Sequence, residues 1–159
     1  MPNTTIITEG ELIAAMPRIT DEAYSMNITM AIADVERYIV KDYIGDANYI
    51  EFLDNPLGHD SELNGGIVVK DDKEYFIAGL KAAEYHLVYA YMLRETVYVS
   101  VYGVSHKKDD YSEAAGESEL LKVAMFHNEM GLGYLRELCE YMGIKTDGKT
   151  HRGFWNEYV

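Results

Sequence analysis

The sequence is poor in several residue types from which compact functional sites are often built. Its single cysteine, Cys139, excludes a disulfide within the chain and any cysteine-based zinc site. It has 14 basic residues against 27 acidic ones, a net charge of −13. So acidic a chain is not expected to bind nucleic acid by neutralising phosphates.

The sequence also shows no signal of a targeting segment or of a membrane-spanning segment. Residues 1–12 lack the basic and apolar regions of a secretory signal peptide. The most apolar stretch is interrupted by Lys81, Glu84 and His86, so it is not expected to cross a bilayer. We therefore expect a soluble protein with no membrane partner.

The chain has 159 residues, of which 48% are hydrophobic, enough for one domain with a real core. We expect a single helical domain over residues 1–159, with a core at about 8–143 and a C-terminal tail at 144–159. The fold class is mainly α. It is a helical bundle of three to five helices around a central apolar helix, with a small β-hairpin and an extended arm.

Apolar residues recur at spacings of three and four, which predicts helices. A short first helix follows Thr8 and ends at Pro17. The later helices are expected at Asp21–Ile44, Asp46–Asp54, Ala78–Glu95 and from about Glu117 to Met142. Thr20 or Asp21 would cap the second helix, whose buried stripe is Ile28, Ala31 or Ile32, Val35, Ile39 and Tyr43. In Asp46–Asp54 the inward residues would be Tyr49, Ile50 and Leu53.

Two β-rich runs, Ile67–Val69 and Tyr75–Ile77, flank a charged turn and predict the hairpin. The helix at Ala78–Glu95 is apolar on nearly every side, which is typical of a buried helix. After it, residues 96–104 alternate valine with tyrosine or serine, which predicts a strand or an arm that seeks a partner.

The predicted interface residues come from this arm, from the loop after it and from the aromatic tail. They are Val97, Tyr98, Val99, Val101, Tyr102, Val104, Lys107, Tyr111, Phe154 and Trp155.

One stretch, Gly143–Thr150, matches the phosphate-binding pattern G-x-x-x-x-G-K-S/T. That mechanism needs a buried strand before the loop and a helix after it. Here a helix precedes it and only nine residues follow Thr150, which favours a helix stop and a polar turn.

Other candidate residues also have structural interpretations. Among the five histidines, none lies in a metal-binding motif, and His86 and His127 are expected to be core histidines. Cys139 is expected to be a small buried hydrophobe, and Gly131 and Gly133 are expected to permit close approach of another backbone. We expect no catalytic residue, metal or cofactor, and hence no enzyme.

A resemblance is carried by three groups of residues. They are Gly66 with Tyr75–Lys81 and Ala83, then Tyr89–Tyr91, then Gly103–Ser105 with Lys107 and Tyr111–Glu113. In their order and spacing the chain resembles the head–tail connector (adaptor, or head-completion) proteins of tailed bacteriophages, in particular a group from phages and prophages of gut bacteria. The resemblance covers about residues 8–143.

The resemblance implies a structural virion protein without catalysis or cofactor, assembled in the host bacterial cytoplasm. It implies a ring, usually of twelve copies, that lies between the portal protein and a tail or stopper protein. The extended arm would reach a neighbouring copy. Residues 1–64 carry 3 basic and 12 acidic side chains, so we expect an acidic channel through which DNA passes without specific binding.

Two other functions remain open from the residues alone. The first is a P-loop-like nucleotide-binding protein that uses Gly143–Thr150. The second is a small acidic adaptor module that binds one host protein.

Overall fold

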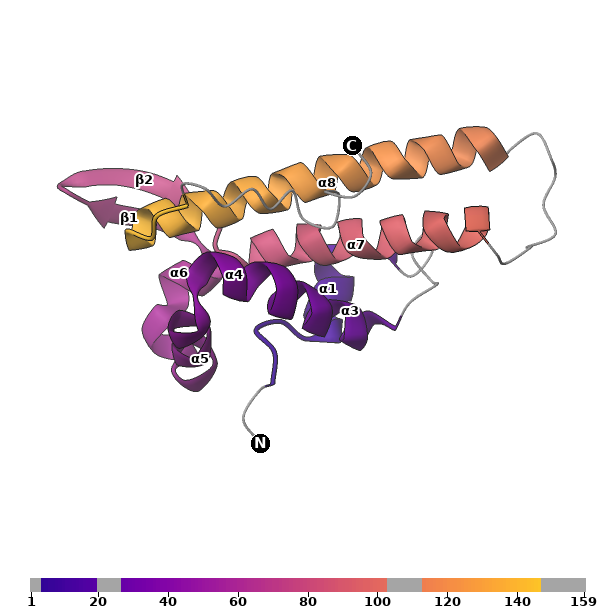
Figure 1. The fold of residues 1–159 in the computed structure, drawn as a ribbon. Helices are drawn as coiled ribbons and strands as arrows, with labels where there is room; N and C mark the ends of the chain where they lie inside the picture. The colour runs from indigo at the N-terminus through magenta and orange to yellow at the C-terminus, as the bar shows by residue number, and fades with distance from the viewer. Residues whose placement is uncertain (1–3, 20–26, 103–112, 147–159) are drawn as a thin grey trace.

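Two long antiparallel helices form the body of the computed structural model, which describes residues 4–19, 27–102 and 113–146, with backbone only at 97–102 and 113–117. They are α7 (Leu80–Tyr102) and α8 (Glu113–Met142), and they lie side by side (Figure 1). Shorter helices pack on α7, and a two-stranded sheet lies at the end of α8. The predicted mainly α bundle with a small hairpin is confirmed.

A glycine allows α7 and α8 to approach closely. A Cβ atom on Gly131 would lie 2.6 Å from Leu87 Cγ and 2.9 Å from the carbonyl oxygen of Ala83. A Cβ on Gly133 would meet nothing within 4 Å. The predicted close approach is therefore confirmed at Gly131 and wrong at Gly133.

One continuous helical rod packs against α7, made of α3 (Ile28–Val35), the π-helical turn η1 (Glu36–Val40) and α4 (Lys41–Ile44). It begins after Asn27, whose side chain accepts a hydrogen bond of 3.2 Å from Met30 N. Because Asn27 is extended, the predicted single helix from Asp21 is wrong. The proposed caps Thr20 and Asp21 lie outside the described residues.

The buried positions on this rod repeat every four residues. They are Ala31, Ile32, Val35, Glu36, Ile39, Val40, Tyr43 and Ile44. In a regular α-helix a four-residue step overshoots one turn by about 40°, so the stripe would drift around the helix. The wider π turn offsets this drift and keeps both rows buried, with α3 against α7 and α4 against α8. The predicted stripe is confirmed, with Ile28 only half-buried.

The N-terminal segment leads into α1 (Glu9–Ala15), which contacts α3 (Figure 1). Thr8 and Glu11 form a capping box: the Thr8 hydroxyl accepts from Glu11 N at 3.2 Å, and Glu11 accepts from Thr8 N at 2.8 Å. Ile7 and Leu12 are fully buried, which fastens the segment to the bundle.

Three short helices turn the chain back towards the hairpin at one end of the bundle (Figure 1). They are α5 (Asp46–Asp54), η2 (Pro56–His59) and α6 (Asp60–Asn64). In α5 the predicted inward residue Ile50 is 55% exposed, whereas Tyr49 and Phe52 are buried and Leu53 is half-buried. The inward face is therefore rotated by one residue from the prediction.

The hairpin consists of β1 (Gly66–Lys70) and β2 (Lys73–Ile77), paired antiparallel with Lys70 opposite Lys73. Asp71 and Asp72 form its two-residue turn with φ of 53° and 60°. Positive φ at both positions is the type I′ geometry, which matches the twist of the strands. Aspartate tolerates this geometry better than most residues.

The hairpin is fixed to the C-terminal end of α8. Lys70 Nζ donates to the carbonyl oxygens of Glu140 and Tyr141, each at 3.0 Å, and Ala78 N donates to Glu137 Oε1 at 3.0 Å. The lysine charge also interacts favourably with the negative end of the α8 dipole. The hairpin is thus held on its inner face.

The base of the hairpin is a crossing of two backbones. Gly65 and Gly79, with φ of 75° and 89°, precede β1 and follow β2. A Cβ on Gly79 would lie 2.5 Å from Gly65 N, and a Cβ on Gly65 would collide with the carbonyl of Ala78. Only glycine fits this crossing, both for its space and for its backbone angles.

The predicted extended arm is wrong over Thr96–Tyr102, which forms the last turns of α7. Intrinsic strand preference spans only about 1 kcal/mol and depends on context, whereas an existing helix gains one hydrogen bond per added residue. Thr96 follows this rule, since its hydroxyl donates to the Met92 carbonyl at 2.8 Å. Of the described helices, none has the length and apolar content needed to span a membrane.

Candidate functional site

The predicted interface residues do not form one described surface. Val97, Tyr98, Val99, Val101 and Tyr102 belong to α7, where only the backbone is described. The remaining five residues lie outside the described residues: Val104, Lys107, Tyr111, Phe154 and Trp155. The search for a site therefore turns to groups that the structure places together.

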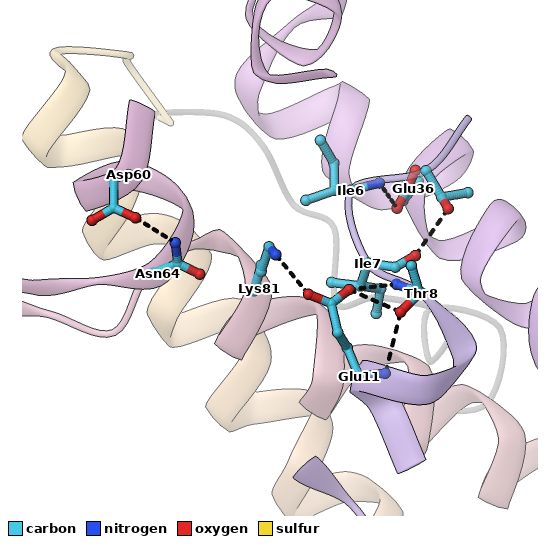
Figure 2. A network of polar contacts seen from close by, with 9 residues as sticks. Ile6, Ile7, Thr8, Glu11, Glu36, Asp60, Asn64 and Lys81 are labelled. Carbon is cyan, nitrogen blue, oxygen red and sulfur yellow. Dashed lines mark hydrogen bonds and ion pairs between the residues drawn. The ribbon is translucent and has the colours of Figure 1, made fainter. Parts of the chain in front are cut away.

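A buried polar cluster joins the N-terminal segment to the rod and to α7 (Figure 2). Glu36 in the π turn is 1% exposed; its carboxylate accepts from Ile6 N at 2.7 Å and from the Tyr49 hydroxyl. Glu84 on α7 is fully buried, and neither of its carboxyl oxygens accepts a hydrogen bond from a described residue.

Burial is the main cause of the acidity changes in this cluster. It raises the pKa of Glu84 well above the usual range, and the neighbouring Glu36 carboxylate raises it further. Burial also raises the pKa of Glu36 and outweighs the hydrogen bonds from Tyr49, Glu84 and Ile6, which lower it. We infer that the pair holds a proton at neutral pH, because two buried carboxylates cannot both ionise cheaply.

The cluster acts as an anchor for the chain. Next to it, Lys81 Nζ on α7 forms an ion pair of 2.7 Å with Glu11 of the capping box (Figure 2). Burial alone would raise the pKa of Glu11, but the hydrogen bonds from Lys81 and Thr8 lower it. Through the bond from Ile6 N to Glu36 and the ion pair of Lys81 with Glu11, the cluster holds the N-terminal segment on the bundle.

A histidine pair lies between α7 and α8. His86 Nδ1 and His127 Nδ1 are 2.7 Å apart, so one ring donates and the other accepts, and the rings stack at 5.0 Å. Burial, and then the charge of His127, lowers the pKa of His86 to about 4. The two histidines satisfy each other as predicted, but both are half-buried rather than in the core. Within residues 4–19, 27–102 and 113–146 no three His, Cys, Asp or Glu side chains could share a metal ion.

The other sequence candidates have structural roles. Cys139 is fully buried, and its Sγ donates to the Tyr43 carbonyl at 3.6 Å, which confirms the predicted buried hydrophobe. Gly143 ends α8 with φ of 75°, which confirms the helix stop. The part of the phosphate-binding pattern from Asp147 to Thr150 lies outside the described residues.

The outer face of the hairpin is open to solvent and carries three apolar side chains beside Glu74, the cross-strand partner of Val69. Ile67 and Phe76 are cross-strand partners, and they are 73% and 67% exposed. Val69, on the same face, is 61% exposed. These three residues, named here the hairpin face, are presented on a strand pair whose inner face is fixed to α8. Such a surface suits contact with another protein.

Sequence reasoning missed both the acid cluster and the hairpin face. The hairpin face had a signal, since Ile67, Val68 and Val69 are consecutive and alternate residues of a strand point to opposite sides. With Val68 facing the bundle, Ile67 and Val69 had to place apolar side chains on the outer side of the strand. Glu84 had no such signal, because an acid on an apolar helix is more often at its exposed edge.

Comparison with known proteins gives a single result. Residues 40–147 match the model of a family of unknown function, DUF6712. No curated protein matches the chain, and no solved structure matches it.

Proposed function

This chain belongs to the DUF6712 family, whose function is unknown, and we propose that it is a structural virion protein, a head–tail connector that forms a ring between portal and tail. DNA would pass through the ring without specific binding. Its partners would be further copies of itself, usually twelve in the ring, the portal protein, and a tail or stopper protein.

The observation that carries the proposal is the hairpin face. Ile67, Val69 and Phe76 are apolar, more than half exposed, and presented on a rigidly mounted hairpin. Burying them on a partner would gain roughly 25 cal/mol per Å² of apolar surface removed from water. A monomer that functions alone would gain nothing from keeping them exposed.

Two further features support an assembly role. The order and spacing of three residue groups in the sequence resemble those of the phage connectors over about residues 8–143. The net charge of −13 suits a protein that lines a DNA channel, because like charges keep DNA from adhering to the wall.

The experiment is negative-stain electron microscopy of the protein mixed with the portal protein encoded beside it. We expect a ring of copies stacked on the portal ring, and co-sedimentation of the two proteins. A protein that stays free of the portal at micromolar concentration would contradict the proposal. Acidic side chains of residues 4–64 found on the outside of the assembled ring would contradict the proposed DNA channel.

A further inference from the structure

The buried acid pair Glu36–Glu84 is in contact with a short, non-helical part of the N-terminal segment. Residues 4–8, named here the strap, form this part, and Ile6 N donates to Glu36 Oε1 at 2.7 Å (Figure 2). The side chains of Ile6 and Ile7 are 7% and 0% exposed. The strap is therefore held on the bundle both by a hydrogen bond to the acid pair and by two buried apolar side chains.

A pocket of about 320 Å³ opens beside the acid pair. Thr4 and Thr5 of the strap line it, together with Glu36 and Tyr49. Glu36 is nevertheless only 1% exposed, and Ile6 N and the Tyr49 hydroxyl both donate to its carboxylate. Because the strap forms part of the pocket wall next to Glu36, a shift of the strap would let water reach this carboxylate without moving a helix.

The groups that face the pair supply it with little positive charge. These titratable and charged side chains come from the rod, α1, α5 and α7; they are Asp34, Arg37, Lys41, Glu11, Tyr49, Lys81 and Tyr85. Lys81 attracts a charge on Glu84, but it is already bound to Glu11 at 2.7 Å, and Glu11 repels the same charge. On the pocket side, Lys41 Nζ lies 4.5 Å from the centre of the Tyr49 ring, and Arg37 is exposed. Among the described residues, the pair thus has no cation of its own.

A second negative charge on the pair would be costly in the closed structure. Glu84 is fully buried, and neither of its carboxyl oxygens accepts a hydrogen bond from a described residue. A buried carboxylate without such partners is strongly disfavoured, and the charge of Glu36 beside it adds repulsion. The pair must therefore either keep a proton or gain access to water.

We propose that a proton closes the strap: the strap lies on the bundle while the Glu36–Glu84 pair holds the proton, and its opening releases that proton. The strap is the part that moves, because it is five residues long and in no helix, whereas α3 of the rod packs against α7. Opening brings Ile6 and Ile7 to the surface, so the proton controls whether these apolar side chains are available for contact. This inference is independent of the connector role.

Hydrogen exchange at the Ile6 amide, followed by NMR between pH 5 and pH 8, tests the inference. The protection factor divides out the intrinsic pH dependence of exchange. In the wild type it should fall by up to about tenfold for each pH unit, the limit for an opening that releases one proton. Glu84→Gln should lose most of this slope, because glutamine has no proton to release. Glu129→Gln, at an exposed position of α8, is the control and should keep the wild-type slope.

Urea separates an opening of the strap from unfolding of the whole protein. An opening of five residues exposes little surface, so exchange at Ile6 should not change at low urea concentrations. The amides of Leu132 and Leu135 on α8, whose side chains are fully buried, should be better protected than Ile6. Their exchange should accelerate with urea, because they are expected to exchange only when the bundle unfolds.

A labelling arm reports on the strap through a side chain. The single native thiol, Cys139, is fully buried, so a cysteine in the strap can be labelled selectively. Ile7→Cys is made alone and together with Glu84→Gln, and the two labelling rates are compared at each pH. Their ratio cancels the titration of the thiol itself. Labelling of Ile7→Cys alone should become faster relative to the double variant as the pH rises.

Three results would overturn the inference. The first is an Ile6 protection factor and a labelling ratio that do not change with pH. The second is an equal slope in the wild type and in Glu84→Gln. The third is an Ile6 amide as protected and as sensitive to urea as Leu132 and Leu135, because the strap would then leave only when the protein unfolds. If Glu84→Gln does not fold, Glu84→Met, of similar size and without an acid, takes its place in both arms.

Discussion

The carboxylate of Glu84 on α7 lies beside that of Glu36 in the π turn, and both are closed to solvent. The Glu36 carboxylate accepts hydrogen bonds from Ile6 N and the Tyr49 hydroxyl, whereas the Glu84 carboxyl accepts none from the described residues. The proton of the pair therefore belongs mainly on Glu84, because the carboxylate that accepts hydrogen bonds is the better stabilised anion.

Glu84→Gln should make stability less dependent on pH. The folded-state pKa of Glu84 is raised, so its ionisation in the unfolded chain lowers stability as the pH rises above about 4.5, by at most about 1.4 kcal/mol per pH unit. Glutamine carries no charge and removes this loss. In urea unfolding, the free energy of unfolding of the variant should rise relative to that of the wild type between pH 5 and pH 8. Parallel pH profiles of the two proteins would contradict a raised pKa of Glu84 in the folded state. Exposed Glu129→Gln is the control.

Tyr49→Phe should loosen the N-terminal segment. It removes the hydroxyl that donates to Glu36, and loss of a donor to a buried acceptor costs about 1–3 kcal/mol. Hydrogen exchange at the Ile6 amide, which donates to the same carboxylate, should become faster. Tyr38→Phe on the same rod, where the ring is 53% exposed, should leave exchange unchanged.

Alanine at two glycines of α8 should have opposite effects. Gly133→Ala should stabilise the protein by up to about 1 kcal/mol, because alanine favours the helix and the site has open space. Gly131→Ala gains the same preference but drives Cβ into Leu87 and the Ala83 carbonyl, and overpacking costs about 1–3 kcal/mol. The melting temperature of each variant, measured by thermal unfolding, gives the sign of its stability change. Equal shifts of the two melting temperatures would contradict the close packing at Gly131.

Lys70→Met should weaken the attachment of the hairpin to α8. The substitution keeps most of the apolar stem but removes the two hydrogen bonds to the last carbonyls of α8, at a cost of about 0.5–1.5 kcal/mol each at most. Amide exchange in β1 and β2 should quicken. Lys73→Met, at the exposed position opposite Lys70 on the other strand, is the control and should leave amide exchange unchanged. Equal effects of the two variants would show that Lys70 does not attach the hairpin to α8.

His86 should remain neutral in mildly acidic solution. Its pKa is lowered to about 4, mainly by burial, so its imidazole resonances should shift only near that pH in an NMR titration. The sign is opposite to that of Glu84: a depressed histidine pKa costs stability as the pH falls from about 6.5 to 4. Titration near pH 6.5 would show that the histidine pair is open to water.

Sequence patterns predicted the structure correctly where the spacing of apolar residues and the local backbone preference indicate the same element. The buried stripe from Ala31 to Tyr43 and the two runs of the hairpin follow from periodicity alone. The pattern misled at Thr96–Tyr102, where alternation and β-branched residues indicate a strand but an established helix continues. There the strand preference of the residues is weaker than the tendency of α7 to continue. A short window of sequence does not show that a stable helix comes before it.

The hairpin face could be predicted only in part, for a physical reason. Which side of a hairpin faces outward depends on what packs against its other side. Here that is the end of α8, where the nearest carbonyl bonded by Lys70, that of Glu140, is seventy residues away in the sequence. The Glu36–Glu84 pair likewise joins residues whose proximity comes from helix packing. Such contacts are set by tertiary structure and leave no local spacing to detect.

The Gly65–Gly79 crossing has a mechanical consequence. Because the two backbones are in direct contact there without side chains between them, we expect the hairpin and the first turn of α7 to move as one rigid unit. A load on the hairpin tip would reach the centre of the bundle without being absorbed by rotating side chains. A partner that pulls on the hairpin would thereby strain α7 along its length.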